Sequence, residues 1–141
     1  MIKVDTIRED IHKLLPEIRS YLESNPKILF AYLFGSLAQR KQTPLSDVDI
    51  AVYLSDTSSL PEDKLEIVGH FINILETDEI DLVILNTAPL PLAARIIENK
   101  IILADKQPFL RHNFESLTLR KYFDFSIKEW EILKRRYLIG R

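Results

Sequence analysis

The sequence predicts one domain of the α/β (α+β) class, in which helices pack on a small mixed β-sheet. Its 141 residues are enough for a single domain with a buried core, and 46% of them are hydrophobic. Four short apolar runs, rich in residues that favour strands, alternate with segments of helical periodicity. That alternation is typical of a sheet covered by helices. We therefore expect residues 1–141 to form one domain, with a core over about 27–105.

Each element follows from its local pattern. Residues 4–24 place isoleucine and leucine at helical spacing, with Pro16 expected to kink or break the helix, and Pro26 follows its end. A later helix begins at Ser58 or Ser59, just before a proline and two acids. The predicted strands are residues 27–34, 48–54, 79–85 and 100–104. The helix that begins at Ser58 or Ser59 is expected to end near Glu76. The remaining predicted helices span 90–99 and 109–138, the latter as one helix or as two joined near Asp124.

Composition excludes several classes of protein. The chain has no cysteine, which rules out disulfides and thiolate metal sites. The first fifteen residues mix acids and bases and lack the apolar stretch of a signal peptide, and no apolar run is long enough to cross a bilayer. We expect a cytoplasmic protein with no membrane contact.

Charge is distributed unevenly along the chain. The net charge of −2 combines an acidic body with a basic end, since residues 109–141 hold eight Lys and Arg against four Asp and Glu. A nucleic-acid binder should carry a broad basic surface, so we expect no direct nucleic-acid binding. A basic end on an acidic body is better suited to contact with a partner protein.

Two aspartates interrupt the second apolar run. Asp47 and Asp49 lie two residues apart, so strand alternation directs both carboxylates to one face. Like charges this close repel each other unless a cation lies between them, and hard oxygen ligands suit Mg²⁺. The pair therefore predicts a metal site. The opposite face is apolar throughout: Val48, Ile50, Val52 and Leu54.

A third acid interrupts the third apolar run. Asp81 stands inside EIDLVIL, whereas Asp78 and Glu79 fall in the polar approach to that strand and are more simply read as solvated. If the two strands are neighbours, Asp81 joins Asp47 and Asp49, and the three could hold two Mg²⁺ ions close together. Two-metal clamps of this kind drive in-line phosphoryl displacement.

A glycine and a serine end the first apolar run. Gly35 allows the backbone to approach a phosphate closely, and the following turn offers free N–H donors. The hydroxyl of Ser36 can add one more hydrogen bond. We therefore expect Gly35 and Ser36 to bind a triphosphate.

This combination resembles the minimal nucleotidyltransferases of the DNA polymerase β superfamily. The resemblance rests on Gly35-Ser36, ten intervening residues, Asp47-Val48-Asp49, and Asp81 on a later strand. It implies the polymerase β-like nucleotidyltransferase fold, two Mg²⁺ ions on the three acids, and ATP on the Gly-Ser pair. The third acid would also help to activate the attacking hydroxyl.

The later parts of the chain resemble the antitoxin branch of that superfamily, the MNT antitoxins that pair with HEPN-domain toxins. The segments PLPLAARIIENKIILAD, residues 89–105, and LRKYFDFSIKEW, residues 119–130, carry this likeness. It implies an antitoxin that transfers AMP from ATP to a tyrosine of its HEPN ribonuclease toxin, within a hetero-oligomer. The sequence departs from the family where arginine often follows Gly-Ser, since Leu37 stands there; Arg40 or Lys41 is the candidate replacement.

Two alternative functions remain open at this stage. The same site could modify a small molecule, as aminoglycoside nucleotidyltransferases do, or the protein could neutralise its partner by contact alone. The C-terminal segment, about 108–141, holds seven of the aromatic residues beside a basic cluster. Trp, Tyr and Arg are common interface anchors, so we expect part of this segment to contact a partner and part to fill the core.

Overall fold

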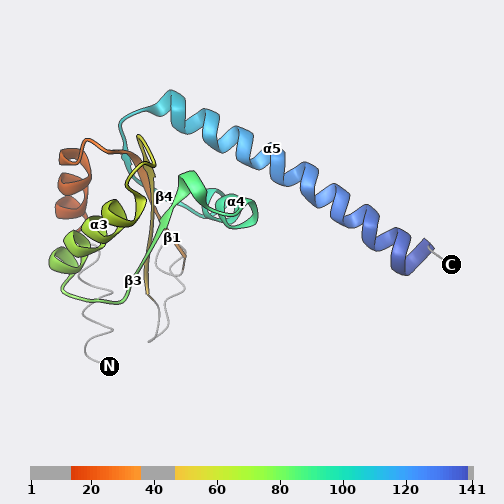
Figure 1. The fold of residues 1–141 in the computed structure, drawn as a ribbon, viewed down its shortest axis with the longest axis horizontal. Helices are drawn as coiled ribbons and strands as arrows, with labels where there is room; N and C mark the ends of the chain where they lie inside the picture. Colours follow the sequence, from red (N-terminus) through yellow and green to blue (C-terminus); the bar gives the residue numbers. More distant parts are fainter. Residues whose placement is uncertain (1–13, 36–46, 140–141) are drawn as a thin grey trace.

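The computed structural model describes residues 14–35 and 47–139, with side chains described as far as Tyr137. Within these residues four strands form one sheet in the order β3-β2-β1-β4 (Figure 1). β1 pairs antiparallel with both β2 and β4, whereas β2 and β3 run parallel, so the sheet is mixed as predicted. The strands are β1 (Ile28–Phe34), β2 (Val48–Leu54), β3 (Ile80–Ile84) and β4 (Ile101–Asp105).

The helices match the predicted segments. Residues 14–24 are helical, with Pro16 in the first described turn, whereas residues 4–13 of the predicted helix, and with them the predicted kink or break at Pro16, lie outside the described part of the chain. The last helix continues through Asp124 without a joint, so one long helix forms rather than two. The remaining elements are α3 (Leu60–Leu75), a 3₁₀ turn η1 (Leu85–Thr87), α4 (Leu90–Glu98), α5 (Pro108–Leu133) and a π-helical end η2 (Lys134–Ile139).

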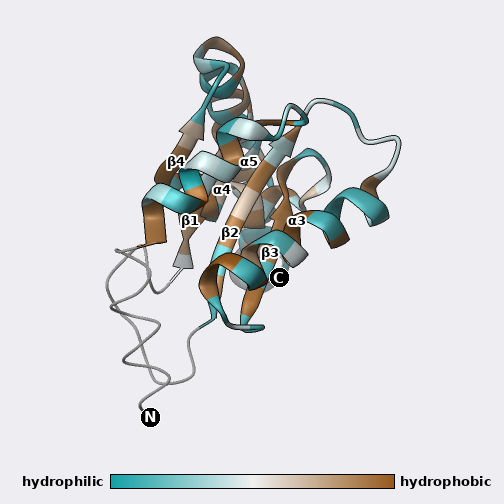
Figure 2. Cartoon of the chain, turned by 90° about the vertical axis from the view of Figure 1, so that its left-hand side faces the viewer, coloured by the Kyte–Doolittle hydropathy of each residue, from teal (hydrophilic) through white to brown (hydrophobic). Residues whose placement is uncertain are grey.

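The two faces of the sheet support two separate apolar cores. On one face, alternate residues of β2 such as Ile50 pack with Ile67 and Phe71 of α3 and with the helical residues 14–24. On the other, Phe30 and Ala51 pack with residues of α4 and with the start of α5. Hydrophobic residues accordingly concentrate on the strands between the helices (Figure 2). This helix-sheet-helix arrangement, together with the mixed sheet, confirms the predicted fold class.

A tight connection between α3 and β3 sets where β3 begins. α3 ends at Glu76, whose left-handed backbone (φ 54°) directs its N–H to the carbonyl of Ile72. The buried Thr77 then accepts a hydrogen bond from the N–H of Glu79 at 3.1 Å. The carbonyl of Glu79 accepts from the N–H of Val48 at 2.9 Å. These bonds tie Glu79, the residue just before β3, to the connection after α3 and to Val48, the first residue of β2.

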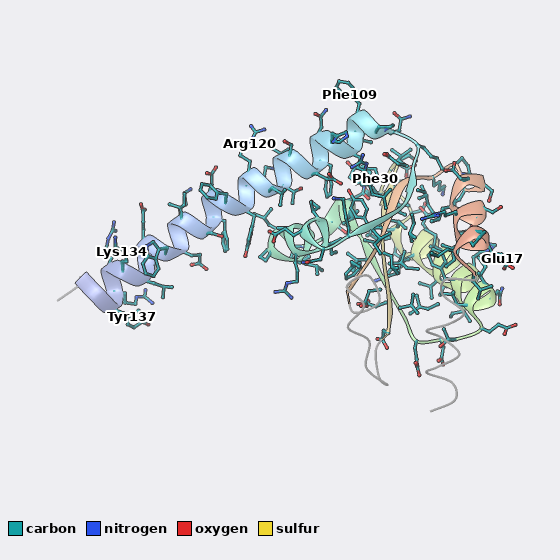
Figure 3. The ribbon with its side chains drawn as sticks, turned by 180° about the vertical axis from the view of Figure 1, so that it is seen from behind. Glu17, Phe30, Phe109, Arg120, Lys134 and Tyr137 are labelled. Carbon is teal, nitrogen blue, oxygen red and sulfur yellow. The ribbon has the colours of Figure 1, made fainter. Side chains whose placement is uncertain are left out.

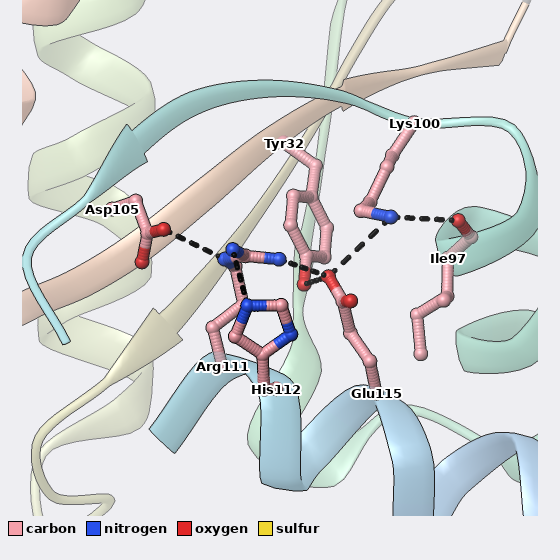
Figure 4. A network of polar contacts seen from close by, with 7 residues as sticks. All are labelled: Tyr32, Ile97, Lys100, Asp105, Arg111, His112 and Glu115. Carbon is pink, nitrogen blue, oxygen red and sulfur yellow. Dashed lines mark hydrogen bonds and ion pairs between the residues drawn. The ribbon is translucent and has the colours of Figure 1, made fainter. Parts of the chain in front are cut away.

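A buried polar network fastens the beginning of α5 to the sheet (Figure 4). The hydroxyl of Tyr32 on β1 donates to Glu115 Oε2 at 2.6 Å, and Arg111 Nη1 contacts the same oxygen at 3.1 Å. Arg111 Nε also donates to Asp105 Oδ2 at 2.8 Å, and Lys100 Nζ lies 3.4 Å from Glu115 Oε2. The carboxylate of Glu115 on α5 thus contacts Tyr32 on β1 and Lys100, the residue just before β4.

Beyond this network α5 leaves the body and projects away from it (Figures 1 and 3). Tyr137, at the far end, lies well apart from the sheet (Figure 3). The projecting part exposes many large apolar side chains. They are Leu117, Leu119, Phe123, Phe125, Ile127, Trp130, Ile132, Leu133 and Tyr137. None of the helices described is both long and apolar enough to cross a membrane.

Candidate active site

The predicted site begins where β2 enters the sheet. Asp47 directly precedes β2 and is exposed, and Asp49 is its second residue and is half-buried. Val48 and Ile50 point into the core shared with α3, so the carboxylate of Asp49 lies on the opposite face, the one that carries Ala51. The structure therefore places Asp49 on the α4 side of the sheet, as strand alternation predicts.

Asp81 occupies the matching position on β3. Asp49 and Asp81 are register partners in the parallel pairing of β2 with β3. Neighbouring strands lie about 4.8 Å apart, and residues at matched positions present their side chains on the same face. Leu82 points into the core shared with α3, which directs Asp81 to the face of Asp49. The structure thus brings these two predicted acids together, and Asp81 is exposed at the sheet margin.

The electrostatics of Asp49 reflect both its burial and the neighbouring acids. Partial burial, together with the negative charges of Asp81 and Asp47, raises the pKa of Asp49 to about 6. Without a cation, the carboxylate therefore takes up a proton at a higher pH than an ordinary aspartate does. A bound cation would remove this repulsion.

Gly35 closes one side of the site. It follows β1 with a left-handed backbone (φ 75°), and the last residue of β1, Phe34, is the register partner of Asp49. A Cβ built on Gly35 would overlap the carboxylate of Asp49. Only glycine leaves room for both this backbone and that side chain. Ser36, Leu37, Arg40 and Lys41, which the sequence analysis also considered, lie outside the described residues.

The donor set fits Mg²⁺ by its chemistry. The acids offer hard oxygen ligands, their negative charges disfavour ionisation of Asp49, and the lack of a side chain at Gly35 leaves room for the Asp49 carboxylate. Across residues 14–35 and 47–137, however, no three His, Asp or Glu side chains converge tightly enough to form a ready-made metal site. To bind an ion, the side chains would have to move closer together than they are in this structure. The assignment of Asp47, Asp49 and Asp81 as metal ligands stays a prediction.

The rival third acids take other positions. Asp78 is exposed in the connection that precedes β3, and the backbone of Glu79 is engaged with Thr77 and Val48. Neither residue is the register partner of a β2 aspartate. The geometry favours Asp81.

Sequence reasoning missed two features next to this site. One is the network centred on Glu115; its i, i+4 spacing from Arg111 was a local signal, but Tyr32 lies 83 positions earlier in the chain and gave none. The other is a groove of about 510 Å³ along the outer edge of β3, which Asp81 helps to line. A groove between elements distant in sequence leaves no local pattern to read.

Comparison with known proteins agrees with this geometry. The family model for polymerase beta nucleotidyltransferases matches residues 16–109. No curated protein gives a significant match. Among solved structures, a chain of a toxin–antitoxin complex with AMP-PNP is 28% identical, with a TM-score of 0.66 over 90% of this chain and 95% of that one.

Two further structures share the fold. A chain of an MntA–HepT toxin–antitoxin complex is 25% identical, with a TM-score of 0.61 over 91% of this chain and 94% of that one. A chain in the complex of tri-AMPylated Shewanella oneidensis HEPN toxin with MNT antitoxin is 24% identical. Its TM-score is 0.61 over 91% of this chain and 93% of that one. The family match spans the whole sheet, from β1 to β4, and includes all the predicted site residues. By sequence and by fold, this chain belongs to the polymerase beta nucleotidyltransferase family.

Proposed function

We propose that this protein is an Mg²⁺-dependent antitoxin that transfers AMP from ATP to a tyrosine of a HEPN ribonuclease toxin. The observation that carries the proposal is the pairing of Asp49 with Asp81, with Gly35 packed against Asp49. The family match and the 28% identical relative solved with AMP-PNP support a nucleotide as substrate. The toxin–antitoxin complexes of two relatives at or above 25% identity support the partner.

The resemblance to the family suggests a role for each acid. Asp47 and Asp49 would hold both Mg²⁺ ions, and Asp81, at the exposed margin, would hold the one nearer the acceptor. The ions would neutralise charge on the triphosphate. Asp81 would also accept, directly or through water, the proton that the tyrosine hydroxyl loses. The tyrosine oxygen then bonds to the α-phosphorus, the bond from that phosphorus to the bridging oxygen breaks, and pyrophosphate leaves.

Gly35 and Ser36 would hold the triphosphate beside these acids. The left-handed turn at Gly35 lets the backbone pass close to Asp49 without a side chain in the way. The same lack of a side chain would allow the phosphates to approach the backbone N–H groups that follow. Catalysis would rest on positioning and charge neutralisation, as in phosphoryl transfers generally.

The projecting part of α5 is the surface we propose for contact with the toxin. One line of side chains recurs at alternating spacings of four and three residues, which places it on a single stripe of the helix. Phe123 and Trp130 on this stripe are 64% and 55% exposed. A stripe of this kind packs against another helix. It consists of Leu119, Phe123, Ser126, Trp130 and Leu133 on α5, and Tyr137 of η2 continues the same spacing.

Intact-mass spectrometry tests the function directly. The protein is incubated with its HEPN toxin, ATP and Mg²⁺, and the toxin should gain mass in AMP units on a tyrosine. Asp81→Asn should reduce the gain strongly, whereas Asp78→Asn, an exposed acid outside the site, should not. A toxin that is bound and inhibited without any mass change would instead identify a contact-only antitoxin. A toxin that is neither bound nor modified would point to a small-molecule acceptor.

A further inference from the structure

A groove runs along the outer edge of β3, between α3 and the segment that joins β3 to α4. Its volume is about 510 Å³, and all four residues 81–84 of β3 line it. Figure 1 shows β3 at the margin of the sheet, consistent with its terminal place in the strand order. One wall comes from Leu60, Pro61 and Lys64, and the other from Thr87, Ala88, Pro89 and Leu92.

The backbone of β3 offers hydrogen-bonding groups to this groove. The carbonyl of Glu79 accepts from Val48 of β2, so alternation directs the backbone groups of residues 79, 81 and 83 toward β2. The N–H and C=O groups of Leu82 and the N–H of Ile84 therefore point the other way, whereas the C=O of Ile84, the N-cap of η1, serves that turn. In the part of the chain that the structure describes, no strand lies beyond β3 to pair with them. An open edge of this kind accepts an extended chain.

The groove is continuous with the candidate active site. Asp81 lines the groove and is also the register partner of Asp49. A chain lying along β3 would therefore pass the acid to which we assign the acceptor side of the reaction. The walls are mainly apolar, with Lys64 as their one positively charged member. Such walls suit the alternate side chains of a strand.

We propose that the acceptor segment of the partner protein lies in this groove as an added strand of the sheet. Its backbone pairs with Leu82 and Ile84, and a hydroxyl-bearing side chain at one end reaches Asp81. The four lining residues of β3 span about 13 Å, enough for a short extended segment. This inference rests on the proposed transfer to a protein and adds where that protein's acceptor segment binds.

Amide hydrogen exchange of the complex tests the pairing without relying on catalysis. With the HEPN toxin bound, the amides of Leu82 and Ile84 should exchange at least about tenfold more slowly than in the free protein, because they become hydrogen-bonded. Unchanged exchange at both amides in a saturated complex would overturn the proposal. This result stands whether or not the toxin is modified.

A substitution that fills the groove tests its use in catalysis. Thr87 is an exposed residue in the wall of the groove, so Thr87→Trp places a large side chain in the groove. Ser20→Trp is the matched control, because Ser20 is exposed on the helix over residues 14–24 and does not line the groove. Thr87→Trp should lower the rate of toxin modification by roughly tenfold or more while ATP affinity in calorimetry stays unchanged. Ser20→Trp should leave both unchanged.

The outcomes separate this inference from the proposed function. If the unsubstituted protein modifies the toxin and Thr87→Trp does so equally fast, the groove is not the acceptor site and the function stands. If Thr87→Trp loses ATP affinity, the groove holds the nucleotide and the inference is wrong. If the unsubstituted protein does not modify the toxin, the proposed function fails, and the exchange at Leu82 and Ile84 alone decides whether an extended segment pairs there.

Discussion

Asp49 on β2 and Asp81 on β3 occupy matched positions in the only parallel strand pair of the described sheet. Burial makes Asp49 harder to ionise, and the charge of Asp81 on the same face acts in the same direction. Together with Asp47 they raise the pKa of Asp49 to about 6. An ionised Asp49 therefore lowers the stability of the metal-free fold, and a bound cation would offset this cost.

The first prediction concerns stability and pH. The pKa of Asp49 is higher in the folded protein than in the unfolded chain, so the folded state binds more protons between about pH 4 and pH 6. Stability should therefore fall as pH rises through this window. Asp49→Asn removes the effect and should stabilise the metal-free protein at pH 7.5 by about 1–2 kcal/mol, allowing for solvent screening of a half-exposed group.

Urea unfolding in the presence of EDTA measures this difference at pH 4 and pH 7.5. The gain from Asp49→Asn should be small at pH 4, where Asp49 is protonated in the folded protein and roughly half protonated in the unfolded chain. An equal gain at both pH values would show that the substitution acts through packing and not through charge.

The second prediction concerns Mg²⁺. Binding an ion requires the ionised form of Asp49, so protons compete with Mg²⁺ below about pH 6. Calorimetry with ATP should show Mg²⁺-dependent affinity that is clearly weaker at pH 5.5 than at pH 7.5. The double variant Asp47→Asn/Asp49→Asn should lose this dependence while it remains folded. Unchanged affinity in that variant would remove these residues from the metal site.

The third prediction compares two glycines. At Gly35 the backbone is left-handed and a Cβ would overlap the carboxylate of Asp49, so Gly35→Ala should destabilise the fold by about 1–2 kcal/mol or more and impair nucleotide binding. Gly69 lies within α3, and a Cβ there meets nothing within 4 Å. Gly69→Ala should instead stabilise by about 0.5–1 kcal/mol. Thermal unfolding of the two variants gives the comparison, and a neutral Gly35→Ala would contradict the close approach to Asp49.

The fourth prediction concerns the attachment of α5. Arg111 is buried between Asp105 and Glu115, so Arg111→Met leaves two carboxylates without their guanidinium and should destabilise by about 3 kcal/mol. Tyr32→Phe removes the hydrogen bond to Glu115 and should lower the free energy of unfolding by about 1.5 kcal/mol. The control Arg120→Met, on the exposed part of the same helix, should change little. Urea unfolding ranks the three, and equal stability of Arg111→Met and Arg120→Met would show that the network does not hold the helix.

The fifth prediction concerns the α5 stripe. Trp130 on the stripe and Arg135, which follows α5 in η2, are both exposed, so Trp130→Ala/Arg135→Ala should leave unfolding and ATP affinity unchanged. Toxin binding and modification should both weaken, because loss of a large exposed aromatic anchor reduces the contact area. Phe114→Ala is the contrasting variant, since Phe114 packs on Phe30 and Tyr53 and its loss should destabilise the fold. If the double variant also unfolds, the stripe is part of the core and not an interface.

The sequence by itself determined the fold class and the faces of the strands. Alternation in β2 was enough to place Asp49 opposite Ile50, because side chains in a strand switch faces at every residue whatever lies around them. The apolar runs were enough to locate all four described strands to within a residue or two. The family resemblance is likewise carried by local residues, and the match over residues 16–109 confirms it.

Only the tertiary structure decided which of these elements meet. That β2 and β3 are parallel neighbours, with Asp81 and neither Asp78 nor Glu79 opposite Asp49, depends on contacts between residues far apart in the chain, which a local pattern does not encode. For the same reason the bond from Tyr32 to Glu115 and the groove along β3 were invisible in the sequence. The aromatic residues of α5 show the division within one element: their spacing revealed a helix, but packing alone decided that Phe114 is core and Trp130 is exposed.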